Sequence, residues 1–128
     1  MSTVLLIALG GAIGALIRWK LAHFTNHEHM PIGTLLANVL GSFLVGFASA
    51  LYADAFFATK GLVAFLYPLI AIGLAGSIST MSAVAIEMKN ISRLKNISTT
   101  AGYLAVSVGL SILALAFGIW LGTSQPIN

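Results

Sequence analysis

The chain has 128 residues, of which 59% are hydrophobic and only 7% are charged, and its net charge is +3. A soluble domain carries roughly 25% charged residues, so this composition indicates an integral membrane protein. The absence of cysteine excludes disulfides, thiolate metal sites and cysteine nucleophiles. The six basic residues fit charges that flank membrane spans better than a nucleic-acid surface, so no nucleic-acid partner is expected.

Four apolar runs each approach or exceed the roughly 20 residues that cross a bilayer as a helix. They cover residues 4–19, 32–57, 62–88 and 97–122, and the first lengthens if its helix continues to Phe24. The connections, near residues 23–31, 54–61 and 89–96, are too short to form a second domain. Residues 1–3 carry no Lys or Arg, so the first run is not expected to be a signal peptide. We predict a single all-α membrane domain of four helices over residues 1–128.

Small residues recur at helical spacing in the first two spans. Gly10 and Gly14 stand four apart, as do Gly33, Ala37 and Gly41. Residues four apart share one face of a helix, and small side chains let a second backbone approach that face closely. The spacing therefore predicts two faces for close helix packing.

Polar side chains within the second and fourth spans also share helix faces. Thr34 and Asn38 do so on the second span, and Tyr103, Ser107 and Ser111 form a stripe on the fourth. An amide in hydrocarbon needs hydrogen-bond partners, so Asn38 is expected to point into the protein or into a pore. Each of these residues, taken alone, is also compatible with an ordinary interhelical hydrogen bond.

The third span contains the least regular stretch, GLAGSISTMSAVAIE at residues 73–87, in which glycines and hydroxyl residues lie within an apolar run. A bilayer supplies no water to unpaired backbone groups, so this stretch predicts a helix interrupted where protein or a watery cavity surrounds it. This stretch, Asn38 and the hydroxyl stripe of the fourth span together supply hydrogen-bond donors but no acidic side chain at membrane depth. Such a set of side chains is expected at a site that binds an anion. Glu87 closes the span, where water or Lys89 is its expected partner.

The basic residues predict an orientation. Lys20, Lys89, Arg93 and Lys95 fall on the side of the first and third connections, whereas only Lys60 falls on the side of the second. Loops rich in Lys and Arg remain in the cytoplasm, so both termini are expected to face the exterior.

An enzyme is not expected, because no Ser/His/Asp set, paired carboxylates or phosphate-cradling loop occurs. His27, Glu28 and His29 look superficially like metal ligands, but their spacing in a short connection fits a solvated loop better. One alternative function is a proton-coupled small multidrug transporter, which needs a membrane carboxylate that the spans do not show at depth. Another is a non-conducting subunit that completes another chain's channel.

Four stretches resemble one family. GGAIGALIR at residues 10–18, GTLLANVLG at 33–41, residues 76–87 and AGYLAVSVGLS at 101–111 resemble the Fluc (CrcB) fluoride channels of microbes over all four helices. The resemblance implies passive fluoride efflux across a bacterial plasma or inner membrane. It implies an antiparallel, dual-topology dimer with two pores, a third helix broken at mid-membrane, and a central structural Na⁺ held by backbone carbonyls of Gly76 and Ser79. A hard cation of this kind prefers oxygen ligands.

The resemblance also implies which residues line the fluoride pathway. They are Asn38, Met81, Ser82, Val84, Tyr103, Ser107 and Ser111. The family has a pair of phenylalanines whose ring edges face the anion, whereas Met81 and Val84 offer only an apolar lining. It has a further hydroxyl where this chain has Leu115. Arg18 and Thr34 are each expected either to lie in a vestibule of the pathway or to have a structural role.

Two departures from the family point to a heterodimer. A dual-topology chain should have little charge bias, yet this chain has four basic residues on one side against one on the other. A substituted phenylalanine pair is tolerable if an oppositely oriented partner supplies an intact pore. The chain is therefore expected to pair with a paralogous subunit, and the alternative is an antiparallel homodimer with an altered pathway.

Overall fold

Four membrane-length helical segments make up the computed structural model, which describes residues 2–27, 30–58 and 66–124. Helix α1 spans Ser2–Thr25 and α2 spans Ile32–Ala58. The third segment consists of a π-helix, η1 (Pro68–Ala75), a short α4 (Gly76–Ile78) and α5 (Met81–Leu94), and α6 (Ile97–Thr123) is the fourth. The segments are long and apolar enough to cross a bilayer, so the chain is a multi-pass membrane protein.

The third connection is shorter than the sequence predicts. Residues 89–94 belong to α5 and not to a loop, and only Lys95 and Asn96 separate α5 from α6. The charged residues do not end the helix. On α5 they occupy the exposed face, with Lys89 and Arg93 exposed, while Ile91 is buried and keeps the helix packed. The side chain of Asn96 then caps α6 by accepting a hydrogen bond from the Thr99 N–H at 3.1 Å.

The first connection contains a small antiparallel pair, β1 (Asn26–His27) and β2 (Met30–Pro31). This connection begins after Thr25, because α1 continues past Phe24, an extension of the first helix that the sequence analysis considered. The histidine-rich run expected to form a solvated loop falls here. Glu28 and His29 lie outside the described residues, as does the predicted start of the third span at residues 62–65.

Glycine faces bring the backbones together, as the spacing in the first two spans predicts. A methyl group on Gly10 would clash with the Leu69 carbonyl oxygen of η1, and one on Gly33 would clash with the Leu21 carbonyl oxygen of α1. A methyl on Gly41 would lie 3.0 Å from the Ala75 carbonyl oxygen. The approaches at Gly10 and Gly33 are too close for any larger residue and the one at Gly41 is tight, so they set the positions of α1, α2 and the third segment relative to one another.

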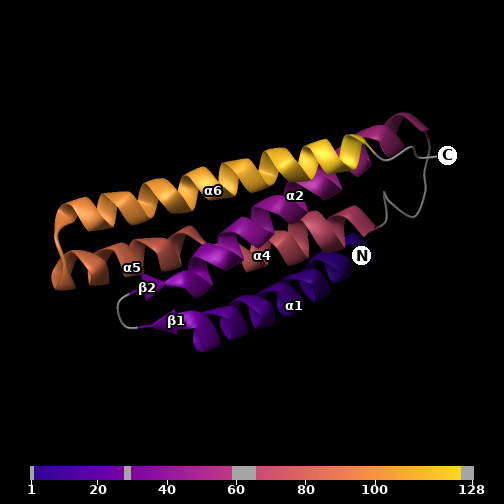
Figure 1. Cartoon of the computed structure of the whole chain (residues 1–128). Coiled ribbons are helices and arrows are strands. Elements are labelled where there is room, and N and C mark those ends of the chain that lie inside the picture. Colours follow the sequence, from indigo (N-terminus) through magenta and orange to yellow (C-terminus); the bar gives the residue numbers. More distant parts are fainter. Residues whose placement is uncertain (1, 28–29, 59–65, 125–128) are drawn as a thin grey trace.

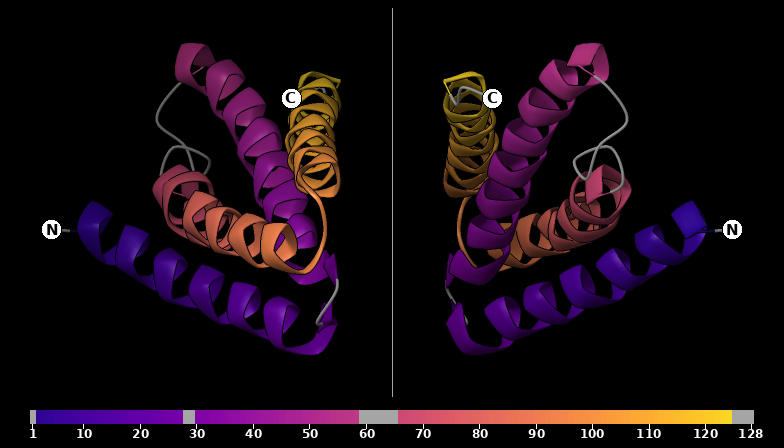
Figure 2. Two further views of the ribbon diagram at one scale, coloured as in Figure 1. Left: turned by 90° about the vertical axis from the view of Figure 1, so that its left-hand side faces the viewer. Right: turned by 90° about the vertical axis from the view of Figure 1, so that its right-hand side faces the viewer.

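The ends of the segments divide into two groups. Both termini lie at one end of the molecule, while the β1–β2 pair and the junction of α5 with α6 lie at the other (Figure 1). In both views of Figure 2, α1 and α6 lie on opposite sides, with α2 and the third segment between them. Lys20, Lys89, Arg93 and Lys95 therefore gather at one end, here called the basic end.

Candidate functional site

The third segment loses helical conformation at Ser79 and Thr80, within the stretch that the sequence marks as irregular. Ser79 (φ −73°, ψ 147°) and Thr80 (φ −154°, ψ 126°) are both extended. Asn38 of α2 contacts both backbone groups of Thr80. Its Oδ1 accepts from the Thr80 N–H at 2.7 Å, and its Nδ2 donates to the Thr80 carbonyl at 3.2 Å. Asn38 thus clamps the break by satisfying two backbone groups that a helix would otherwise pair.

Local bonds complete both sides of the break. The Thr80 hydroxyl accepts from the Ala83 N–H at 3.3 Å and so caps α5. The Ser79 N–H donates to the Ala75 carbonyl at 3.2 Å. In a continuous helix, the Thr80 N–H would pair with the carbonyl of Gly76. Because that N–H is bound to Asn38, the Gly76 carbonyl is released from its helical donor, and Gly76 is exposed on the surface of the chain.

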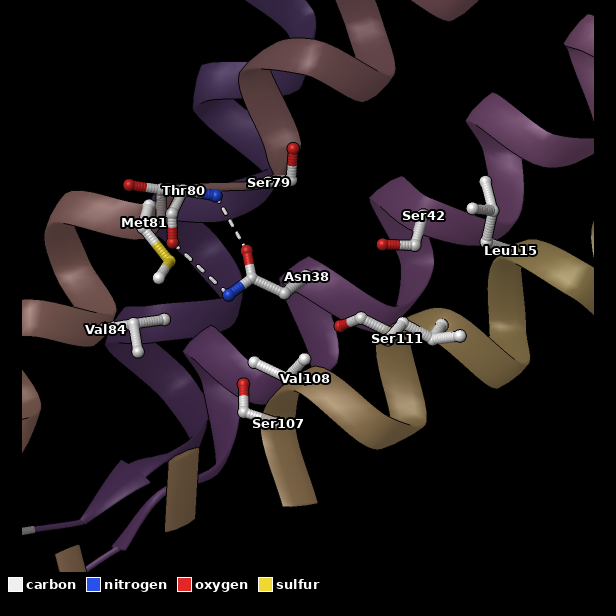
Figure 3. A pocket seen from close by; sticks show the side chains of 11 residues that line it. Asn38, Ser42, Ser79, Thr80, Met81, Val84, Ser107, Val108, Ser111 and Leu115 are labelled. Atoms are coloured by element: carbon white, nitrogen blue, oxygen red, sulfur yellow. Dashed lines mark hydrogen bonds between the residues drawn. The ribbon is translucent and has the colours of Figure 1, made fainter. Parts of the chain in front are cut away.

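A groove of about 340 Å³ runs beside the break, between α2, α5 and α6 (Figure 3). No charged side chain is among the residues that line it. Its lining consists of Asn38, Ser42, Ser79, Thr80, Met81, Val84, Ser107, Val108, Ser111, Ile112 and Leu115. The structure therefore brings six of the residues singled out by sequence into one groove: Asn38, Ser79, Met81, Val84, Ser107 and Ser111.

Hydrogen-bond donors are concentrated where α2 faces α6. Ser107 and Ser111 stand one turn apart on α6, and the structure gives their hydroxyls no hydrogen bond to any other described residue. Asn38 has two N–H groups on Nδ2, of which the Thr80 carbonyl uses one. Figure 3 shows Asn38 between the break and the α6 serines. The groove thus offers donors to a small polar or anionic species and no carboxylate to repel it.

The rest of the groove is apolar. Met81 opens α5 and is 70% exposed, whereas Val84, one turn later, is 2% exposed. Both line the groove, together with Leu115 of α6. Met81 therefore leaves hydrophobic surface uncovered beside the donors.

A second polar cluster lies one helical turn from the groove toward the basic end. Glu87 accepts a hydrogen bond from the Thr34 hydroxyl through Oε1, and from the Tyr103 hydroxyl through Oε2 at 2.7 Å. Each member of this cluster lies about one turn from a groove residue on the same helix. Thr34 is four residues from Asn38, Glu87 is three from Val84, and Tyr103 is four from Ser107. Sequence reasoning expected water or Lys89 beside Glu87 and missed the Thr34 and Tyr103 hydroxyls. The Tyr103 proton is directed at Glu87, so this hydroxyl is not a free donor to the groove.

Three other residues singled out by sequence lie outside the groove lining. Ser82 is exposed, and its hydroxyl lies 3.0 Å from that of Thr80. Arg18 is half-buried toward the basic end of α1. Gly76 lies on the other side of the break, where an added methyl group would meet no atom closer than 3.9 Å, apart from its own neighbours.

Sequence reasoning also left two polar groove residues out of the predicted pathway. Ser42 follows Asn38 by one helical turn, so the same spacing argument that grouped Thr34 with Asn38 would have found it. Thr80 belongs to the irregular stretch, but nothing local distinguishes it from its hydroxyl neighbours. Among the described residues, no group of three or more His, Asp or Glu side chains could hold a metal ion.

Comparison with known proteins identifies related chains. The family described as CrcB-like protein, Camphor Resistance (CrcB), matches residues 5–119. The chain is 35% identical over 120 residues to the "Fluoride-specific ion channel FluC" of Pseudomonas paraeruginosa, covering 92% of this chain and 91% of the relative. It is 33% identical over 126 residues to the FluC of Roseobacter denitrificans (94% and 95%). To "FluC 2" of Yersinia pseudotuberculosis it is 30% identical over 121 residues (92% and 94%).

Proposed function

Because this chain belongs to the CrcB family, we propose that it is a subunit of a fluoride channel that lets fluoride leave the cell passively through the bacterial inner membrane. The observation that carries the proposal is the uncharged groove beside the break, with Asn38, Ser107 and Ser111 in its lining. The family match also removes the reason for considering a multidrug transporter.

The groove donors suit fluoride for a physical reason. Fluoride is small and strongly hydrated, so a pore has to replace its water with closely placed donors. The free N–H of Asn38 and the hydroxyls of Ser107 and Ser111 take this role. Met81, Val84 and Leu115 form an apolar wall that binds the anion weakly and allows it to move on. Ser82 and Tyr103 have their hydroxyls near Thr80 and Glu87, so they belong to the margins of the pathway.

The groove is open along its length, so a second subunit has to complete the pore. We place that subunit antiparallel to the first, with the break at mid-membrane and the exposed Gly76 at the contact. Two observations support this arrangement: Gly76 leaves room for another backbone, and its carbonyl has lost its helical donor. With Ser79, it would supply backbone oxygens for a structural Na⁺ between the subunits. Such an ion would hold the two breaks together and take no part in conduction.

The partner is proposed to be a paralogue of opposite charge bias. The basic residues gather at one end of the molecule, which favours a single orientation in the membrane. Met81 and Val84 give this chain's groove no ring edges for the anion, so a partner with its own phenylalanine pair would provide the more conductive pore. The alternative is an antiparallel homodimer in which both pores contain Met81 and Val84.

Fluoride efflux from proteoliposomes, followed with a fluoride electrode, tests the proposal. Vesicles contain either this chain alone or this chain co-expressed with an oppositely biased paralogue. Flux only from the mixed vesicles supports the heterodimer, and equal flux from this chain alone supports the homodimer. In mixed vesicles, a paralogue inactivated at its phenylalanine pair tests whether this chain conducts. Absence of flux in that case identifies this chain as a non-conducting subunit, and absence of flux in every case contradicts the proposed function.

A further inference from the structure

The outer face of the last two turns of α1 carries an exposed patch at the basic end. It consists of Trp19, Lys20, His23 and Phe24, here called the α1 end patch. Trp19 is 60% exposed and Phe24 is 72% exposed. The opposite face of the same turns packs against α2, where the Leu21 carbonyl approaches Gly33. The patch is therefore turned away from the protein, on a helix that spans the membrane.

The aromatic rings of the patch are ordered against one another. The Trp19 and His23 rings are stacked, with centroids 5.5 Å apart and an interplanar angle of 12°. The His23 and Phe24 rings meet edge to face, with centroids 5.3 Å apart. These contacts form a continuous aromatic surface near the end of a span, where amphipathic rings prefer the region of lipid headgroups.

Lys20 gives this surface a positive charge. It is exposed between Trp19 and His23, and α1 carries no acidic residue in its sequence. A lysine near the membrane surface attracts anionic lipid, and its alkyl stem lies along apolar neighbours while the ammonium group extends to the phosphates. A zwitterionic lipid offers no net charge to this ammonium group.

We propose that the α1 end patch is a binding site for the headgroup of an anionic phospholipid such as phosphatidylglycerol, with Lys20 as the residue that selects the charge. The aromatic rings hold the glycerol and upper acyl region, and Lys20 pairs with the phosphate. This inference rests on membrane insertion alone and does not depend on fluoride transport.

The two tryptophans of the chain allow a direct test, because Trp19 lies in the patch and Trp120 lies near the end of α6 at the other end of the molecule. The Trp120→Phe variant, which keeps Trp19 as its single tryptophan, is placed in vesicles with brominated phosphatidylglycerol or brominated phosphatidylcholine. Bromine quenches only the tryptophan that its lipid contacts. Both leaflets have the same composition, so the result does not depend on orientation. The Trp19→Phe variant reports on Trp120 in the same way.

One lysine at the surface predicts about fivefold preference of the Trp19 site for the anionic lipid at low ionic strength, falling as salt is added. In the Lys20→Gln variant, the two brominated lipids should quench Trp19 about equally. Lys89→Gln, which removes a charge at the same end but on α5, should leave it unchanged. Trp120 should show no preference. Equal quenching of Trp19 by both lipids overturns the proposal, as does a preference that survives Lys20→Gln. Quenching by neither lipid also overturns it, since protein would then cover the patch.

Discussion

Replacing Asn38 with alanine removes both the clamp on Thr80 and a donor in the groove. The stability cost follows from the two hydrogen bonds lost. Side-chain hydrogen bonds within membranes contribute about 0.6 kcal/mol each, which sets a lower value of about 1 kcal/mol for the pair. A fully buried orphan N–H costs up to about 3 kcal/mol, but Thr80 is only half-buried and borders the groove, so the cost there is smaller. We therefore expect a loss of about 1–2 kcal/mol.

The same substitution should have a larger effect on fluoride flux. A hydrogen bond to a charged group contributes about 1.5–3 kcal/mol, so losing one donor in the pathway should slow flux by about tenfold to a hundredfold. Lys60→Gln, a change in a connection between spans, should leave flux near the parent value. Stability is measured by titrating mixed micelles with dodecyl sulfate and following tryptophan fluorescence, and flux is measured with a fluoride electrode.

Asn38→Asp separates the two roles of the side chain. An aspartate keeps an oxygen for the Thr80 N–H but has no N–H to offer an anion. It should therefore lose flux even where the contact with the Thr80 N–H is kept. If Asn38→Ala matches the parent in both stability and flux, neither the clamp nor the donor role is correct.

Three further predictions concern assembly, packing and orientation. If subunits pair at Gly76 as proposed, Gly76→Val should abolish chemical cross-linking between subunits without unfolding the subunit. Gly102→Val, on α6 and likewise in open space, should leave cross-linking intact; cross-linked dimers in both variants would argue against a contact at Gly76. Gly10→Ala should lower the dodecyl sulfate midpoint, since its methyl group clashes with a backbone carbonyl of η1; an unchanged midpoint would contradict that packing. Single cysteines at Ser2 and Ser98 lie at opposite ends. In intact cells an impermeant thiol reagent should label only position 2, and comparable labelling of both positions would show insertion in both orientations.

The helices were predictable from sequence because membrane thickness sets their length and hydrocarbon sets their composition. The glycine faces followed from spacing alone. The exact location of the break within residues 73–87 could not be predicted from local sequence, because it depends on the hydrogen bond of Thr80 to Asn38, which lies 42 positions away. The partners of Glu87 were hidden for the same reason, since Thr34 and Tyr103 reach it from two other helices.

Other features depended on tertiary packing that no local pattern records. The charged residues between 89 and 95 favour a loop when only the local sequence is considered. In the structure α5 continues to Leu94, because Ile91 is buried while the charged side chains lie on the exposed face. Nothing in the sequence distinguished the wider turns of η1 from an ordinary α-helix. Groove residues were identified where the family resemblance named them, while Ser42 was missed although it lies one turn from Asn38.

The clamp on Thr80 has a consequence for biogenesis. A chain that enters the bilayer before meeting its partner has to survive there alone, with a bent backbone surrounded by lipid. Asn38 acts on Thr80 as the edge of a neighbouring strand would, so both polar groups of that residue are satisfied within one polypeptide. In a newly inserted subunit, quality-control proteases that recognise unpaired intramembrane backbone would therefore find little at Thr80 to engage.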